Sequence, residues 1–336
     1  MPDDHDDRDG QDDNDDEPRA AARACVLAPA PLLTVTVESS TDGSDDIHVH
    51  AGGQGFWIGR MLQRLGVEVM LCGTFGGESG PIIRRLIEDT GIEVRAVEAL
   101  AGNGVYIHDR RSGERQVVAE SHSPPLSRHE ADELYGAVLG EALDAQVCVL
   151  AGPGTDEVVD DDMYGRLATD MRAAGIPAVA DLSGDRLEAV LKAGVTVLKV
   201  SDEELARDGM LDDRGDATAA IVAVRQLARA GADNVVLTRG HDPSLALLDG
   251  ELYEVRLPRL EPVETRGAGD SLTAGVAAGI LRGLPLTEAV RLGAAAGGIN
   301  VTRHGLGSGA QQDIERLVRL VELQPLERVG LDPCTS

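Results

Sequence analysis

The chain has 336 residues and a formal net charge of −27, which excludes nucleic acids and anionic membranes as natural partners. Four widely spaced cysteines without a CxxC pair indicate neither a disulfide framework nor a zinc site, and this pattern fits a reducing compartment. The longest apolar runs fall short of the roughly 18 residues that a membrane span needs, and the acidic N-terminus is unlike a signal peptide. We therefore expect a cytoplasmic protein.

The first segment of the chain is an acidic tail. Residues 1–17 hold ten acidic side chains and one arginine, with no apolar pattern, so residues 1–22 are expected to be disordered. One folded domain should follow over residues 23–325, and residues 326–336 should form a C-terminal tail.

Two early segments alternate between apolar and polar residues on either side of a turn. They cover residues 33–50, with a turn cluster at 39–44, and residues 103–121, with Arg111-Ser-Gly113 at the turn. This pattern predicts two β-hairpins, each with one solvated face. Neither fits a buried parallel sheet, so we expect them to form a small β-lid.

The rest of the chain alternates between apolar strands and helices. Continuous apolar runs such as Val147-Cys-Val-Leu150 and Val195-Thr-Val-Leu198 indicate strands that are buried on both faces. Strand–helix alternation of this kind predicts an α/β fold, a three-layer α/β/α sandwich with a mostly parallel central sheet.

The segment Glu264-Thr-Arg-Gly-Ala-Gly-Asp270 carries the strongest chemical signal. Its glycines let backbone N–H groups approach an anion, and the apolar run that follows predicts a helix whose N-terminus adds unpaired donors. A carboxylate at Asp270 cannot hold that anion, but it can take a proton from a hydroxyl that attacks it. This arrangement favours phosphoryl transfer to an alcohol, although an ordinary capped helix explains the segment alone.

A second glycine motif, Gly52-Gly-Gln-Gly55, opens an earlier predicted helix that ends at Leu65-Gly66. The segment Glu264–Asp270 has nearly the form D-T-x-G-A-G-D. Because it has both motifs, the chain resembles the ribokinase-like (PfkB) carbohydrate kinase family from about residue 24 to 325. The 1-phosphofructokinase and tagatose-6-phosphate kinase branch is the most similar. The resemblance implies a ribokinase-like fold and ATP-dependent phosphotransfer to a sugar or sugar phosphate. Asp270 would be the base, and the N–H groups of Gly267, Ala268 and Gly269 would form the anion hole.

The resemblance also implies residues for ATP and Mg²⁺. Glu204 would support the metal ion indirectly, through water, although Ser201 and Glu204 also fit a helix capping box. The segment departs from the family's K-P-N-x-x-E pattern at Val200 and Ser201, and Pro243 replaces a glycine of the nucleotide loop. The candidate ATP-binding residues are Lys199, Ser201, Glu204, Thr238, Gly240, Arg266, Gly297, Asn300, His304 and Gly305.

The acceptor side departs further from the family. Gln54 stands where the phosphosugar branch has a lysine, and the lid segment that carries an arginine in that branch reads Gly102-Asn-Gly104 here. Lysine and arginine are the side chains that hold a sugar phosphate, and Arg266 is expected to compensate in part for their loss. Trp57 either packs in the core or stacks on a sugar or base. The candidate acceptor-binding residues are Thr34, Gly52, Gly53, Gln54, Trp57 and Asp270.

Three functions stay open on these residues. The first is a kinase for a sugar or sugar phosphate, the second a nucleoside kinase of the same fold, and the third a ligand-binding or regulatory protein without turnover. Two lids could also pair through their apolar faces and edges, so the resemblance and the pattern together favour a homodimer.

Overall fold

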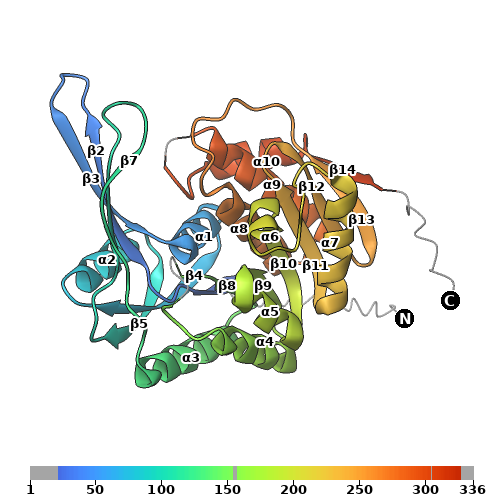
Figure 1. Cartoon of the computed structure of the whole chain (residues 1–336), viewed down its shortest axis with the longest axis horizontal. Coiled ribbons are helices and arrows are strands. Elements are labelled where there is room, and N and C mark those ends of the chain that lie inside the picture. The colour runs from blue at the N-terminus through green and yellow to red at the C-terminus, as the bar shows by residue number, and fades with distance from the viewer. Residues whose placement is uncertain (1–21, 154–156, 304, 327–336) are drawn as a thin grey trace, which may run out of the picture.

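The computed structural model describes residues 22–153, 157–303 and 305–326, and it has two sheets (Figure 1). The larger sheet has ten strands in the order β14-β13-β12-β11-β10-β9-β8-β1-β4-β5. The seven strands from β11 to β5 are parallel to their neighbours, and β12, β13 and β14 extend the sheet antiparallel. The strand bounds are β1 Arg23–Leu27, β4 Glu68–Gly76, β5 Glu93–Ala99, β8 Val147–Ala151, β9 Ala178–Asp181, β10 Val195–Ser201, β11 Ala232–Arg239, β12 Asp242–Leu248, β13 Glu251–Arg256 and β14 Glu322–Pro325.

Helices cover both faces of this sheet. Apolar side chains of α1, α2, α8, α9 and α10 form the core on one face, and those of α3 to α7 form the core on the other. The helix bounds are α1 Gln54–Arg64, α2 Ser79–Glu88, α3 Arg128–Leu143, α4 Asp162–Ala174, α5 Gly184–Ala193, α6 Asp202–Arg207, α7 Ala217–Ala230, α8 Ala268–Leu281, α9 Leu286–Val301 and α10 Gln311–Val318. The predicted three-layer α/β/α architecture with a mostly parallel sheet is confirmed.

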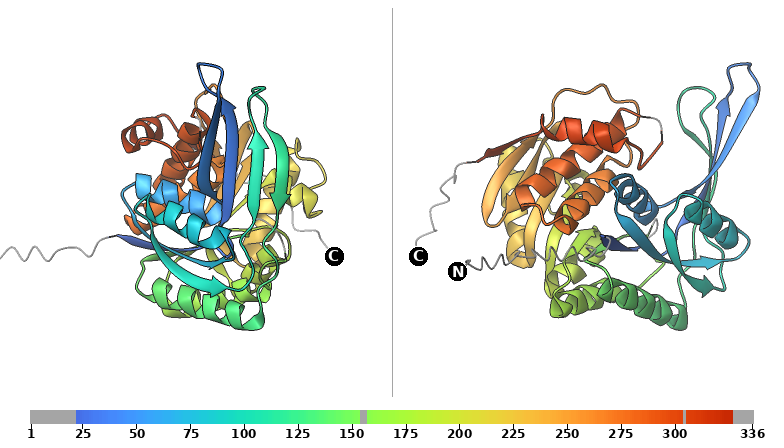
Figure 2. Two further views of the ribbon diagram at one scale, coloured as in Figure 1. Left: turned by 90° about the vertical axis from the view of Figure 1, so that its left-hand side faces the viewer. Right: turned by 180° about the vertical axis from the view of Figure 1, so that it is seen from behind.

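The smaller sheet contains the two predicted hairpins. It runs in the order β3-β2-β6-β7, with bounds β2 Leu32–Ser39, β3 Asp45–Gly52, β6 Val105–Asp109 and β7 Gln116–Ser121. Each hairpin is antiparallel, and parallel pairing of β2 with β6 joins the two. The sheet stands at one end of the molecule, with its hairpin tips projecting beyond the body (Figure 2). We call this sheet the lid.

The C-terminal region ends in a strand that the sequence pattern does not indicate. After α10 ends at Val318, the chain pairs with β13 and places Leu323 opposite Val255. The four-residue strand Glu322–Pro325 is too short to show a period, and its pairing is set by a distant strand, so sequence pattern could not indicate it. Most of the proposed acidic tail (residues 1–21) and of the C-terminal tail (residues 327–336) lies outside the described residues.

The described helices are all too short or too polar to cross a membrane.

Candidate active site

The Gly267–Asp270 segment forms the N-terminus of α8, as predicted. Gly267 is the N-cap residue and has φ 69°, a left-handed conformation that glycine adopts without strain. A Cβ at Gly269 would lie 2.6 Å from Nζ of Lys199, so a side chain there would displace this buried lysine. The helix of 14 residues therefore presents its first N–H groups where the only side chain is the methyl group of Ala268, which is a suitable site for an anion.

Asp270 lies in the first turn of α8 and is half-buried. Burial raises the pKa of its carboxyl group from 3.8 to about 7, and the negative charges of Asp181 and Glu204 add to the rise. Lys199 and a hydrogen bond with the Gln54 side chain act in the opposite direction. A carboxyl group with this pKa is well matched to proton transfer near neutral pH.

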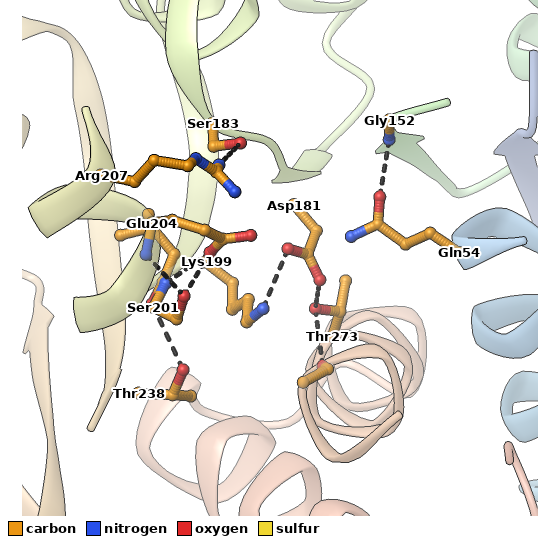
Figure 3. A network of polar contacts seen from close by, with 12 residues as sticks. Gln54, Gly152, Asp181, Ser183, Lys199, Ser201, Glu204, Arg207, Thr238 and Thr273 are labelled. Carbon is orange, nitrogen blue, oxygen red and sulfur yellow. Dashed lines mark hydrogen bonds and ion pairs between the residues drawn. The ribbon is translucent and has the colours of Figure 1, made fainter. Parts of the chain in front are cut away.

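A buried ion pair lies beside this helix terminus (Figure 3). Lys199 Nζ, from β10, donates to Oδ1 of Asp181 at the end of β9 over 3.0 Å, and both side chains are almost inaccessible to solvent. Thr273 Oγ1, from α8, donates to the other carboxylate oxygen over 2.7 Å. Burial lowers the pKa of Lys199, but the surrounding carboxylates outweigh this effect and raise it above its ordinary value. The pair therefore fixes a positive charge against Gly269.

Asp181 was missed by sequence reasoning. A signal did exist, because this aspartate directly follows the apolar run of β9 at the carboxyl edge of a parallel strand. Ligands of open α/β sheets bind outside that edge.

The predicted capping box at Ser201 is present. Ser201 Oγ accepts from the N–H of Glu204 over 3.2 Å, and Glu204 Oε2 accepts from the N–H of Ser201 over 2.7 Å. Ser201 is the last residue of β10, and Glu204 lies in the first turn of α6. Thr238 lies near the end of the neighbouring strand β11, opposite Ser201, and Gly240 directly follows that strand. The structure thus brings the central candidate ATP-binding residues to one edge of the sheet, close to α8.

The candidate residues on α9 lie beneath the anion hole. Asn300 is fully buried, and its Nδ2 donates to the carbonyl of Arg266 over 2.7 Å. A side chain at Gly297 would lie 2.8 Å from the carbonyl oxygen of Ala268, so this glycine allows α9 to approach α8 closely. Both residues shape the loop before α8. Their contact with ATP stays a prediction, and His304 lies outside the described residues.

The Gly52-Gly-Gln-Gly55 motif connects the lid to α1. Gly53 is the N-cap of α1 with φ 102°, and a side chain at Gly52 would lie 2.7 Å from Thr34 Oγ1. Gln54 Oε1 accepts from the N–H of Gly152 over 2.7 Å, just beyond the end of β8 (Figure 3). Gln54 also lies close enough to Asp270 to lower the pKa of its carboxyl group, so the acceptor motif lies beside the predicted base.

A cavity of about 830 Å³ lies between the lid and the body. Among its lining residues, sequence analysis singled out Thr34, Gly53, Trp57, Arg266 and Gly305. Gly305, an ATP-binding candidate, lines this cavity, and its contact with ATP stays a prediction. The remaining lining side chains were not predicted; the polar and aromatic ones are Thr36, Glu38, His48, His50, Arg60, Tyr106, His108, Arg110, Arg115 and Glu264.

Trp57 packs mainly in the core. It is 7% exposed, and its ring lies 4.8 Å from that of Phe56 and 5.9 Å from that of His50, measured between centroids. The core-packing interpretation of this residue is therefore supported, while stacking on a ligand stays a hypothesis.

Two histidines of the cavity, His50 and His108, are neutral at pH 7. Burial lowers the pKa of His50 to about 4, and Arg60 and Arg115 contribute to the fall. Burial, with Arg115 and Arg110, lowers the pKa of His108 to about 4 as well. Neither of these two imidazoles therefore adds positive charge to that of the arginines.

Comparison with known proteins identifies the family. The model of the pfkB family of carbohydrate kinases matches residues 32–313. The chain therefore belongs to this family, and the prediction of a carbohydrate kinase is confirmed.

Individual relatives agree with this assignment. The chain is 26% identical over 307 residues to a 1-phosphofructokinase of Vibrio cholerae serotype O1, covering 90% of this chain and 96% of the relative. It is 25% identical over 275 residues to a tagatose-6-phosphate kinase of Staphylococcus epidermidis, covering 81% of this chain and 88% of the relative. These names match the branch that the motifs indicated.

Solved structures confirm the fold. The tetrameric inhibited form of phosphofructokinase-2 from Escherichia coli superposes with a TM-score of 0.77 and 23% identity, over 89% of this chain and 98% of that one. A ribokinase from Arabidopsis thaliana superposes with a TM-score of 0.69 and 20% identity, over 89% of this chain and 99% of that one. The fold is therefore ribokinase-like.

Proposed function

We propose that this enzyme transfers the γ-phosphoryl group of ATP to a hydroxyl of a sugar or sugar phosphate, with Asp270 as the general base. The observation that carries the proposal is the position of Asp270 in the first turn of α8, directly after the bare N–H groups of Gly267–Gly269, with a pKa of about 7. A proton acceptor and an anion site are thus adjacent.

The step requires few protein groups. The acceptor oxygen attacks the γ-phosphorus while its proton passes to a carboxylate oxygen of Asp270. The new O–P bond forms as the bond from the γ-phosphorus to the β–γ bridging oxygen breaks, and ADP leaves with that electron pair. The N–H groups at the start of α8 stabilise the charge that spreads over the phosphoryl oxygens, and Lys199 adds a fixed positive charge behind Gly269.

The charges near Asp270 suit a divalent cation bound with ATP. Asp181, Glu204 and Asp270 act electrostatically on one another around Lys199, so three carboxylates face one ammonium group. No group of three or more potential ligands converges closely enough to hold a metal ion directly within the described residues. Mg²⁺ commonly binds through one or two carboxylates, waters and nucleotide phosphates. We therefore assign Glu204 to a Mg²⁺ held mainly by water and ATP, where it would neutralise phosphate charge. Asp181 is buried, and its two carboxylate oxygens already accept from Lys199 and Thr273.

The test is ATP consumption with a panel of free sugars, sugar phosphates and nucleosides. Asp270→Asn should lower the rate by roughly 10²–10⁴, because it removes the base while keeping the shape. Turnover that survives in this variant would refute the assignment of the base. A preference for nucleosides would identify a nucleoside kinase, and binding without turnover on any acceptor would favour a regulatory role.

We also propose that two chains associate through their lids. In the paired register of β2, β3 and β6, one face carries Val35, Val37, Ile47, Val49 and Ile107. Ile47 is 62% exposed and Val49 is 47% exposed. Exposed apolar side chains on one sheet face support burial against a second copy.

A further inference from the structure

Three arginines from separate parts of the chain line the lid cavity together. Arg60 lies on α1, Arg115 directly precedes β7 in the lid, and Arg266 directly precedes the anion-hole glycine Gly267. Arg266 is close enough to Arg115 to contribute to lowering its pKa, after the larger effect of burial. Arg115 and Arg266 therefore reinforce one another's positive potential, and Arg60 lines the same cavity.

Within the described part of the chain, none of the three guanidinium groups forms an ion pair, although the protein carries an excess of 27 negative charges. Glu264 lines the same cavity but attracts Arg115 only from beyond ion-pair distance. The Nε atom of Arg115 is buried and lacks a hydrogen-bond partner. The Nδ1 atom of His108, a residue that is only 3% exposed, is also buried and also lacks a partner. Converging like charges and unpaired buried donors cost free energy unless a ligand compensates them.

A fourth arginine of the same cavity provides the contrast. Arg110 lies 3.4 Å from a carboxylate oxygen of Glu264 and 3.9 Å from one of Glu38. The cavity therefore contains one arginine that the fold already neutralises and three that it does not.

The unpaired arginines are held in place by other contacts. Arg115 lies over the ring of Tyr106, with Cζ 4.6 Å from the ring centroid. Arg60 donates through one guanidinium nitrogen to the carbonyl of Leu306 over 3.2 Å, and its Cζ lies 5.8 Å from the centroid of Trp57. Side chains that are already oriented lose less conformational entropy when an anion binds.

We propose that Arg60, Arg115 and Arg266 form an anion subsite that binds a phosphate group already present on the acceptor. This inference rests on the proposed function and specifies its substrate class as a phosphorylated sugar. It also explains why Gln54 and Gly102 stand where the phosphosugar branch has a lysine and an arginine. At these two positions the chain has no cationic side chain. Arg60 on α1, Arg115 in the lid and Arg266 before α8 would supply the positive charge instead.

The subsite has a structural consequence for the lid. Because Arg115 belongs to the lid and Arg60 and Arg266 belong to the body, a phosphate held by all three would tie the two parts together. An acceptor without a phosphate would leave the three charges uncompensated and the lid without this tie.

The test compares wild type with Arg60→Gln, Arg115→Gln and the double variant on ketohexose monophosphates, the matching free ketohexoses and adenosine. We expect KM for the phosphorylated acceptor to rise about 10- to 100-fold in each single variant, with little change in kcat or in KM for ATP. Arg111→Gln is the matched control, because Arg111 is an exposed lid arginine already paired with Asp109 and Asp45. Inorganic phosphate should compete with the acceptor in wild type and lose this effect in the double variant.

Several results would overturn the subsite. They are equal kcat/KM for free and phosphorylated sugars, a rise in KM for ATP instead of the acceptor, or no difference between Arg115→Gln and Arg111→Gln. If turnover is absent with every acceptor, calorimetric binding of a ketohexose monophosphate to wild type and Arg115→Gln decides the question in the same way. Loss of turnover in Asp270→Asn tests the base separately, so the two proposals can fail independently.

Discussion

Asp270 combines a protonatable carboxyl group with a neighbouring site for phosphate. Its pKa of about 7 lies above that of an ordinary aspartate, chiefly because of burial and secondarily because of Asp181. Its protonation state should therefore change within the physiological range, which has consequences for both rate and stability.

The rate should depend on pH through this group. A general base acts only when it is deprotonated, so kcat/KM for the acceptor should fall as the pH decreases through about 7. Initial rates measured between about pH 5 and 9, with saturating ATP, would show this limb. A rate that stays constant down to about pH 5 would mean that Asp270 titrates as an ordinary aspartate or is not the base.

The stability of the folded protein should rise as the pH decreases through this range, whereas the rate should fall. The folded-state pKa of Asp270 is raised above its unfolded value of 3.8, so between pH 4 and 7 the folded protein binds more protons than the unfolded one. Ionised Asp270 is therefore destabilising above about pH 7, and this cost disappears as the pH falls. Asp270→Asn should be more stable than wild type at pH 8, by about 1–3 kcal/mol in urea unfolding, with a smaller difference near pH 5. A variant that is less stable at both pH values would contradict this environment for Asp270.

The Lys199–Asp181 pair offers a second prediction at this scale. Lys199→Met should destabilise the protein by about 3–5 kcal/mol, because it leaves the Asp181 carboxylate buried and uncompensated. Urea unfolding would measure the loss. The matched control is Lys192→Met, the only other lysine of the chain, whose partner Glu188 is exposed. That change should alter stability by less than about 0.5 kcal/mol, and equal effects of the two substitutions would argue against a structural role for the buried pair.

At the scale of elements, α8 and α9 pack unusually closely. A side chain at Gly275 would lie 2.5 Å from Cα of Gly293, so the two helices touch through their backbones. This contact sets the position of the α8 N-terminus relative to the sheet and hence the position of the anion hole. Small residues along α8, rather than its charges, thus position the chemistry.

Glycine-to-alanine substitutions test this packing. Gly275→Ala should destabilise the protein by more than about 2 kcal/mol, since one methyl group forces the helices apart. Gly140→Ala is the control, because Gly140 lies in α3 with open space around it. That change should stabilise the protein by about 0.5–1 kcal/mol through helix propensity. Thermal unfolding of both variants gives the comparison, and a harmless Gly275→Ala would show that the interface can adapt.

Sequence pattern predicted those elements whose signals are local. The parallel strands, the two hairpins, the glycine motifs and the capping box at Ser201 each depend on residues that are close together in the chain. The cavity could not be predicted in this way, because Arg60, Arg115 and Arg266 converge only through the pairing of the lid hairpins and the placement of α1 beside α8. The short strand β14 escaped prediction for a related reason, since its pairing partner decides its conformation.

At the scale of the whole molecule, the apolar face of the lid predicts self-association. Ile47→Asp should convert a dimer into a monomer, because a charge would be buried in the interface between two lids. Light scattering of wild type and variant would measure the change in mass. Leu143→Asp is the control, since Leu143 is 57% exposed but lies at the end of α3, outside the lid. A monomeric wild type, or a dimer that survives Ile47→Asp, would contradict association through this face.

The position of β1 between β8 and β4 also bears on how the chain folds as it is synthesised. β1 is made first, yet it pairs with β4 on one edge and with β8 on the other, and residue 24 lies opposite residue 147. Until about residue 150 has left the ribosome, this apolar strand has an open edge, which at 5–20 residues per second corresponds to roughly 8–30 s. This interior strand of the finished sheet thus keeps an open edge during much of the synthesis of the first half of the chain, and the nascent chain is most open to mispairing before the second half of the protein exists.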